Sequence, residues 1–138
     1  MYVAEESYKT IKEGSKSIGS VRGRIVNAFV QIEMLINAVL TNYFALEERH
    51  SDFITSFLAD EYCSVGLKIR VMEKNIKEDK TYKGFFQDLR RLSNIRNIVA
   101  HSMPSFPDKL AVFSSKGRQQ IDAKDLEREF KEKSNKVH

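Results

Sequence analysis

Residues 25–44 read IVNAFVQIEMLINAVLTNYF, and the order of apolar residues in this stretch decides the fold class. Steps of four and three residues alternate between successive apolar positions, which are Ile25, Phe29, Ile32, Ile36, Val39 and Tyr43. This alternation is typical of one face of an α-helix. Because further apolar residues widen the face, we predict that this helix lies at the centre of a helical bundle.

Other helices are predicted on both sides of the central one. Residues 4–17 form a mostly polar helix, which Gly19-Ser20 separates from the central helix, with Ser20 as a cap. A short apolar turn follows Ser51-Asp52, and residues 62–77 then repeat the spacing of four and three. A last long helix runs from about residue 81 to residues 101–103. Pro104 limits it, because the residue before a proline avoids helical geometry.

The chain changes character after Pro104, and Pro107 indicates an irregular loop. Lys109–Phe113 is strand-like, Ser114–Gly117 is turn-like, and Arg118–Ile121 is a candidate return strand. Asp122 then caps a final helix, whose charges suit the helix dipole.

These elements predict an all-α fold, a four-to-five-helix up-down bundle with a short C-terminal β-hairpin and a terminal helix. A chain of 138 residues is one domain by length. We expect a single domain over residues 1–138, with its core at about 20–104 and the hairpin and last helix at about 108–134.

Composition excludes several classes of function and leaves others open. The formal net charge of +4 permits an acidic partner such as RNA, and solubility explains it equally well. The one cysteine, Cys63, excludes an internal disulfide and a site built from several cysteines. We expect no metal and no cofactor. Residues 25–44 carry too many polar side chains to span a bilayer, so we expect a cytoplasmic protein with no membrane contact.

The segment Arg96-Asn97-Ile98-Val99-Ala100-His101 is the most chemically specific pattern in the chain. On a helix, Asn97 and His101 share a face, and the long side chain of Arg96 can turn to join them. This combination suits phosphodiester cleavage. An imidazole can remove the proton of an RNA 2′-hydroxyl or protonate the leaving 5′-oxygen, while a guanidinium holds the phosphate. That route requires no metal.

A structural interpretation is the commoner one for each of these residues taken singly. A histidine near a helix C-terminus is often only a favourable end residue. An arginine is often only a solvated charge, and Arg90 and Arg91 show that this helix carries others. The order of the residues, late in the last long helix, favours a catalytic interpretation.

The order Arg-Asn-x-x-Ala-His, preceded by Arg91-Leu92-Ser93-Asn94-Ile95, resembles the signature of the HEPN family. In that family a histidine follows an arginine after a gap of about four to six residues, commonly with a polar residue directly after the arginine. The resemblance covers roughly Ser20 to Pro104. It includes the long central helix and the helix that contains Lys68-Ile69-Arg70.

The resemblance implies metal-independent endoribonuclease activity at a composite site, in a homodimer whose two motif helices face one cleft. It implies that Arg96 stabilises the phosphate and that His101 is the general acid or base. Asn97 would orient the imidazole or the phosphate. The resemblance also implies a role in toxin–antitoxin or other defence systems, with an antitoxin protein as a possible partner. Some toxins of the family carry a tyrosine two residues after the histidine, where an antitoxin adds AMP. This chain has Met103 there, so the resemblance does not extend to that route.

Further charged residues could belong to the same site. The cations that we expect at the rim of an RNA-binding cleft are Arg91, Arg90, Lys68 and Arg70. Helical faces usually carry such residues without any partner, so their support is weak. Glu33 could pair with Arg96, or it could be a surface residue of the central helix.

Two alternatives to a ribonuclease stay open at this point. The chain could be a non-catalytic HEPN-like module that binds RNA or a nucleotide or supports protein assembly, because fold and activity are separable. It could also be a regulatory partner that binds a separate enzyme through an apolar face. Arg96 and His101 turned toward internal partners would favour the non-catalytic module.

Overall fold

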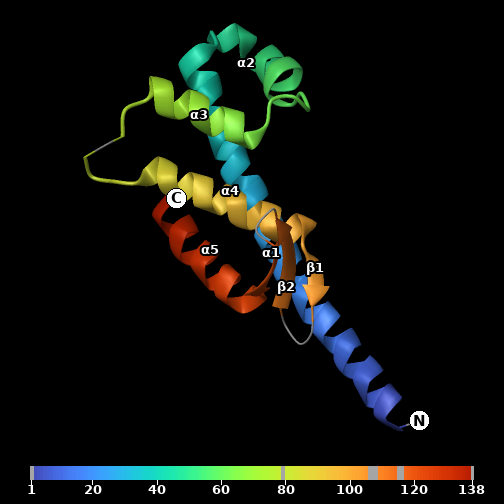
Figure 1. The fold of residues 1–138 in the computed structure, drawn as a ribbon. Coiled ribbons are helices and arrows are strands. Elements are labelled where there is room, and N and C mark those ends of the chain that lie inside the picture. The colour runs from blue at the N-terminus through green and yellow to red at the C-terminus, as the bar shows by residue number, and fades with distance from the viewer. Residues whose placement is uncertain (1, 79, 106–108, 115–116, 138) are drawn as a thin grey trace.

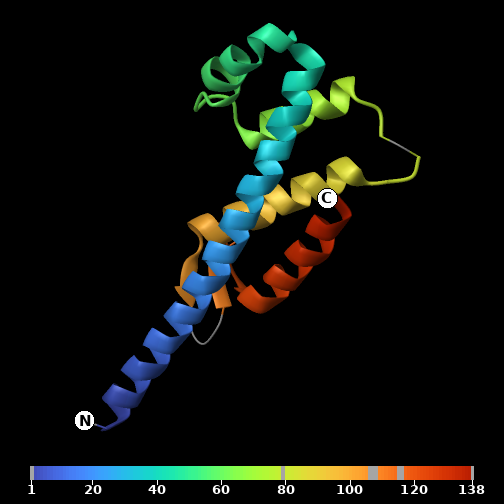
Figure 2. The same ribbon diagram turned by 180° about the vertical axis from the view of Figure 1, so that it is seen from behind.

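The first helix, α1, is long and uninterrupted. The computed structural model describes residues 2–78, 80–105, 109–114 and 117–137, and α1 spans Tyr2–Phe44, which is 43 residues. At 1.5 Å per residue the helix is roughly 65 Å long. Its first part projects beyond the other elements (Figures 1 and 2).

The predicted break at Gly19-Ser20, and the cap at Ser20, are therefore wrong. Gly19 has no positive backbone φ and lies inside the helix. A glycine in a helix costs only about 1 kcal/mol relative to alanine. Burial of Val21 and Ile25 directly after it outweighs that cost, because each buried aliphatic side chain contributes about 1.5–3 kcal/mol.

A distorted helical connection joins α1 to α3. The 3₁₀ turn η1 (Glu47–Arg49) leads through α2 (His50–Asp52) into the π-helical segment η2 (Phe53–Leu58). This connection contains the apolar turn expected after Ser51-Asp52, and its Leu58 is buried.

Helix α3 spans Val65–Asn75 and begins later than predicted. The Ser64 hydroxyl accepts a hydrogen bond from the Leu67 amide at 3.2 Å and so caps the helix. Tyr62, the predicted first residue, lies outside the helix with 85% of its surface exposed.

Helix α4 spans Phe85–His101, and its end agrees with the prediction. Its start lies at Phe85 rather than near Thr81, because Gly84 has a left-handed backbone with φ of 81°. At the other end Ser102 is extended, and its amide donates to the Ile98 carbonyl at 2.8 Å.

An antiparallel sheet follows, with strand order β1-β2-β3. The strands are β1 (Met103–Ser105), β2 (Lys109–Ser114) and β3 (Gly117–Asp122). The predicted hairpin of β2 and β3 is confirmed, although Ser115 and Lys116 of its turn lie outside the described residues.

The strand β1 occupies the start of the segment predicted to be an irregular loop. Pro104 pairs with Leu110 on a strand at the edge of the sheet, where a missing N–H is tolerated. Pro107, the second residue behind that prediction, lies outside the described residues.

Helix α5 (Ala123–Val137) returns along α4. Asp122 caps it as predicted, because its Oδ1 accepts hydrogen bonds from the amides of Lys124 at 2.9 Å and Asp125 at 3.2 Å. α3 and α5 lie on opposite sides of α4 (Figures 1 and 2), and both contact it.

The core is one cluster to which α1, α3, α4, α5 and β2 contribute. Its innermost side chains, Ile32, Leu92 and Ile95, are 0% exposed. The expected helical bundle is confirmed, and its small sheet has a third strand besides the hairpin.

One segment of α1, Gly19–Phe44, is long and apolar enough to cross a membrane by length and composition alone. The central helix of a globular core meets the same criterion, and Ile25, Phe29 and Ile32 of this segment are buried in the core. The expectation that the segment is too polar for a bilayer therefore stays a prediction.

Two glycine substitutions test the course of the chain. Gly19→Ala should raise the free energy of unfolding by about 0.5–1 kcal/mol, because a Cβ there meets nothing within 4 Å and the site is helical. Gly84→Ala should lower it by roughly 1–2 kcal/mol, because of the left-handed backbone. Urea unfolding followed by circular dichroism measures both changes. A destabilised Gly19→Ala variant would contradict the continuous helix.

Candidate functional site

One narrow face of α4 carries exposed polar residues. Arg90, Asn94, Asn97 and His101 follow one another at steps of four, three and four, so they line up along the helix. All four are exposed. Asn97 and His101 therefore share a face, as predicted. Among the described residues, the His101 imidazole has no hydrogen-bond partner.

Arg96 does not join them. Its guanidinium lies over the ring of Phe29, 5.1 Å from the ring centroid, and the residue is half-buried. A cation over an aromatic face is a favourable contact, worth about 0.5–2 kcal/mol. Arg96 also follows Leu92 by four residues and precedes Val99 by three, so it falls on the buried side of α4. Within one chain, the structure separates the arginine of the motif from its histidine.

A second arginine lies at the end of α4. Arg22 of α1 donates from Nη2 to the Ser102 carbonyl at 2.9 Å. This contact places a positive charge at the negative end of the α4 dipole, directly after His101. The Arg22 Nε and the Ser102 Oγ are both buried without a hydrogen-bond partner among the described residues. No local sequence pattern identifies this contact, because 80 residues separate the two partners.

Arg96 lines a polar pocket of about 360 Å³, together with Glu33, Asn37, Ser64 and Lys68. Lys68 donates to Glu33 at 3.1 Å, and the lysine side chain is only 2% exposed. A buried ammonium needs such a partner, because an unpaired charge in the interior is costly. Lys68 is therefore not a rim cation, which corrects the prediction. Glu33 pairs with Lys68 rather than with Arg96.

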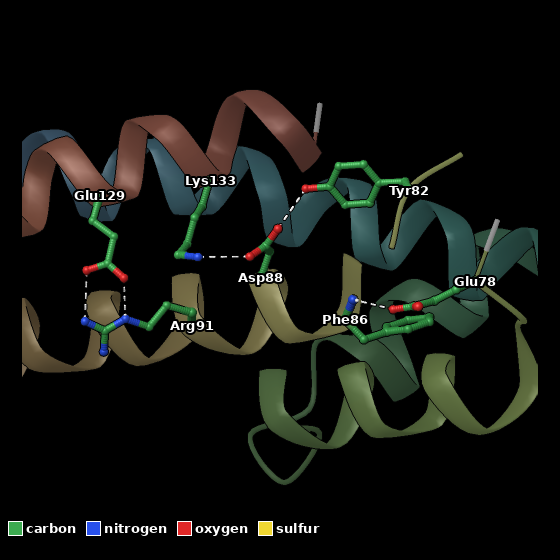
Figure 3. A network of polar contacts seen from close by, with 7 residues as sticks. All are labelled: Glu78, Tyr82, Phe86, Asp88, Arg91, Glu129 and Lys133. Carbon is green, nitrogen blue, oxygen red and sulfur yellow. Dashed lines mark hydrogen bonds and ion pairs between the residues drawn. The ribbon is translucent and has the colours of Figure 1, made fainter. Parts of the chain in front are cut away.

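Arg91 is also held by a partner within the chain, although its side chain is 37% exposed. It donates to Glu129 of α5 through Nε at 2.7 Å and Nη2 at 2.9 Å, a bidentate pair shown in Figure 3. The hydrogen bond from Arg91 lowers the pKa of Glu129, and the positive charges of Arg91 and Lys133 add to this effect. The prediction that Arg91 contacts RNA is therefore not supported, because the guanidinium fastens α5 to α4.

The neighbouring polar contacts both involve Asp88 of α4. Lys133 donates to Asp88 at 3.0 Å, and the Tyr82 hydroxyl donates to the same carboxylate at 2.8 Å (Figure 3). Burial raises the pKa of Asp88, but hydrogen bonds from Lys133 and Tyr82 outweigh it and lower the pKa overall. Burial and the bond to Asp88 raise the pKa of Tyr82 to about 12, so the phenol stays a donor.

The other two predicted rim residues, Arg70 and Arg90, line a groove of about 290 Å³ between α3 and α4. The remaining lining residues are Gly66, Ile69, Ser93, Asn94 and Asn97. Arg90 pairs with Glu73, but 52% and 42% of these side chains are exposed, and such a pair is worth only about 0.2–1 kcal/mol. Arg70 is exposed and makes no ion pair within the part of the chain that the structure describes. Asn97 lines this groove, and His101 follows one turn further along the same face of α4.

An apolar cavity of about 190 Å³ lies elsewhere, between the end of α1, η2 and the start of α3. Its lining includes Phe44, Phe53, Phe57 and the free cysteine Cys63. Within the described ranges, no group of three or more histidine, cysteine, aspartate or glutamate side chains is arranged to hold a metal ion.

Comparisons with known proteins add no relative. No family model matches the chain, and neither a curated protein nor a solved structure matches it.

The ion pair between Arg91 and Glu129 makes the free energy of unfolding depend on pH. The pKa of Glu129 is lower in the folded state than its ordinary value of 4.5. The pair therefore contributes fully to the free energy of unfolding at pH above 4.5, and this contribution is lost as the pH falls through the folded-state pKa. We expect the free energy of unfolding to fall below pH 4.5, and to fall less steeply in Glu129→Gln. Urea unfolding at pH 7 to 3 measures the slopes. Glu132→Gln, an exposed change on the same helix, is the control, and equal slopes in all three proteins would contradict the pair's role.

Proposed function

We propose that this protein is a metal-independent endoribonuclease of the HEPN type, an up-down helical bundle that cleaves RNA as a homodimer. The observation that carries the proposal is the exposed pair of Asn97 and His101, one turn apart at the end of α4. The order Arg-Asn-x-x-Ala-His at the end of a long bundle helix supports the assignment to this family.

The proposed reaction uses the nucleophile that RNA itself carries. The His101 imidazole removes the proton of a 2′-hydroxyl, and the 2′-oxygen forms a bond to the adjacent phosphorus. The bond from phosphorus to the 5′-oxygen breaks, and the imidazolium of His101 in the second copy protonates that oxygen. The products are a 2′,3′-cyclic phosphate and a 5′-hydroxyl end. Asn97, on the same face, orients the phosphate or the imidazole.

Positive charge for the phosphate comes from two directions in this proposal. Arg22 lies at the end of α4 next to His101, with Nη2 held by the Ser102 carbonyl. Arg96, to which the resemblance assigns the phosphate, would have to leave the ring of Phe29 to reach the exposed face. A guanidinium at either place stabilises the charge that builds on the phosphate oxygens.

The exposed apolar surface of α1 supports a homodimer. Met34 is 60% exposed, and Val30, Leu35 and Val39 are each more than 40% exposed. Exposed apolar residues that gather on one element mark interaction surfaces more often than isolated ones do. The same surface would equally suit a separate partner enzyme, and sedimentation of the isolated protein distinguishes the two.

The biological setting of the proposal rests on the family resemblance. It comprises a cytoplasmic toxin or defence protein with RNA as substrate, an antitoxin as possible partner and no membrane contact. An adjacent gene for a small antitoxin-like protein would support it, and an adjacent gene for a large enzyme would favour a regulatory role instead.

Cleavage of a mixed single-stranded RNA in the presence of EDTA tests the activity. The wild-type protein should leave cyclic phosphate ends, and His101→Ala should lose activity by about 10²–10⁴-fold, the usual contribution of a general acid or base. His101 is exposed, so the free energy of unfolding should change by no more than about 0.5 kcal/mol. His50→Ala is the control, because His50 lies outside the site, near the Ala45 carbonyl. Unchanged cleavage by His101→Ala would refute the proposal.

A second candidate function is a non-catalytic module that binds RNA or a nucleotide. The position of Arg96 favours it, since an arginine packed on Phe29 has a structural role that needs no substrate. Such a module would bind RNA as a folded protein and leave it intact, with or without His101.

A further inference from the structure

We propose that the groove between α3 and α4 is a subsite for the phosphate backbone of a single-stranded RNA that runs along α4 to His101. The inference deepens the proposed function and rests on it for the position of the scissile bond. The charged residues that line the groove are Arg70 and Arg90, and its described lining contains no carboxylate. A groove whose charged lining residues are all cations favours an anion.

The guanidiniums are free to change partner. Arg70 has no ion pair among the described residues, and Arg90 has only its half-exposed pair with Glu73. A phosphodiester can replace that carboxylate, because a guanidinium presents two parallel N–H donors to either group. Binding therefore requires rotation of two surface side chains and no change in the backbone.

The floor of the groove offers neutral hydrogen-bonding groups. Ser93 lines it with only 9% of its surface exposed, and its hydroxyl has no partner among the described residues. The oxygen of this hydroxyl is not among the fully buried side-chain atoms without a partner, so it is accessible from the groove and can bond to a ligand oxygen. The amides of Asn94 and Asn97 lie beside it on the same wall. Amides and hydroxyls bind phosphate, sugar or base edges of a nucleic acid.

The spacing of these residues favours a strand over a single phosphate. From Arg90 to His101 the helix advances eleven residues, or roughly 16 Å. One stacked nucleic-acid strand carries a charge about every 3.4 Å, so this distance corresponds to about five nucleotides. Arg90, Asn94, Asn97 and His101 lie along one line of the helix, and Arg70 faces that line from α3. The groove thus leads a strand toward the imidazole.

An oligonucleotide that cannot be cleaved tests the subsite. The probe is a fluorescent 2′-fluoro RNA octamer, which lacks the 2′-hydroxyl nucleophile, and anisotropy gives its Kd between 50 and 300 mM NaCl. Loss of one phosphate contact lowers the slope of log K against log salt by about 0.7, which is about fivefold in affinity at 0.1 M. We expect this change for Arg70→Gln and for Arg90→Gln. Ser93→Ala should weaken binding without changing the slope.

Arg128→Gln is the matched control, because Arg128 is an exposed arginine paired with an aspartate on α5, on the other side of α4. If Arg128→Gln weakened binding of the octamer as much as Arg70→Gln does, net charge alone would explain the effect, and the subsite would be overturned. Wild-type affinity in both groove variants would also overturn it. If uridine monophosphate bound as tightly as the octamer, the inference that the groove binds a strand rather than a single phosphate would be overturned. Because the probe is inert, loss of the proposed cleavage activity leaves these results unaffected, and the two proposals fail separately.

Discussion

Helix α4 packs against α1, α3 and α5, and this packing leaves only a narrow part of its circumference open. Successive residues turn by about 100° around a helix. Phe86, Leu89, Leu92, Ile95 and Val99 are buried and together occupy about half of the circle. Every other residue of the helix must adapt to this burial. Arg96 falls in the middle of the buried half, whereas Asn97 and His101 fall on the open part. The chemistry available to the motif is therefore fixed by the packing of its helix.

The same packing accounts for most of the basic residues near the site. Arg91 pairs with Glu129, Lys133 with Asp88, and Arg24 with Glu127. Each pair fastens α5 to α4 or to α1. Lys68 pairs with Glu33 inside the bundle. The net charge of the chain includes all of these cations, although each of them already has a carboxylate partner. It is therefore a poor measure of the positive charge available to an anionic ligand. Arg70, which lines the groove, has no such partner among the described residues.

Local patterns predicted the elements whose signals lie close together in the sequence. The four-three spacing of apolar residues located the central part of α1 and also α3 and α4, and Asp122 located the start of α5. The end of α4 followed from Pro104. The strand β1 could not be predicted in this way, because its pairing with β2 depends on a contact across the sheet. The continuity of α1 through Gly19 was missed because a turn signal was given more weight than the burial that follows it.

The candidate site was predictable to a different extent. That Asn97 and His101 share an exposed face follows from helical spacing alone, and the structure agrees. The separation of Arg96 from them was available from the same spacing, since Arg96 is four residues after Leu92 and three before Val99. The reach of a long side chain was assumed to compensate, and the contact with Phe29 shows where that reach is directed. The partners of Lys68 and Arg22 lie 35 and 80 residues away, and no local pattern identifies them.

Because Arg96 is half-buried and His101 is exposed, substitutions at these two residues test different properties of the protein. Arg96 covers Phe29, and its Nε is buried without a partner, so its removal disturbs the junction of α1 and α4 whether or not RNA is bound. A loss of activity in an Arg96 variant would therefore not distinguish chemistry from packing. His101 has no partner among the described residues and is exposed, so its removal disturbs nothing that holds the bundle together. The histidine is thus the residue of the motif whose substitution addresses the reaction itself, while the arginine reports first on the fold.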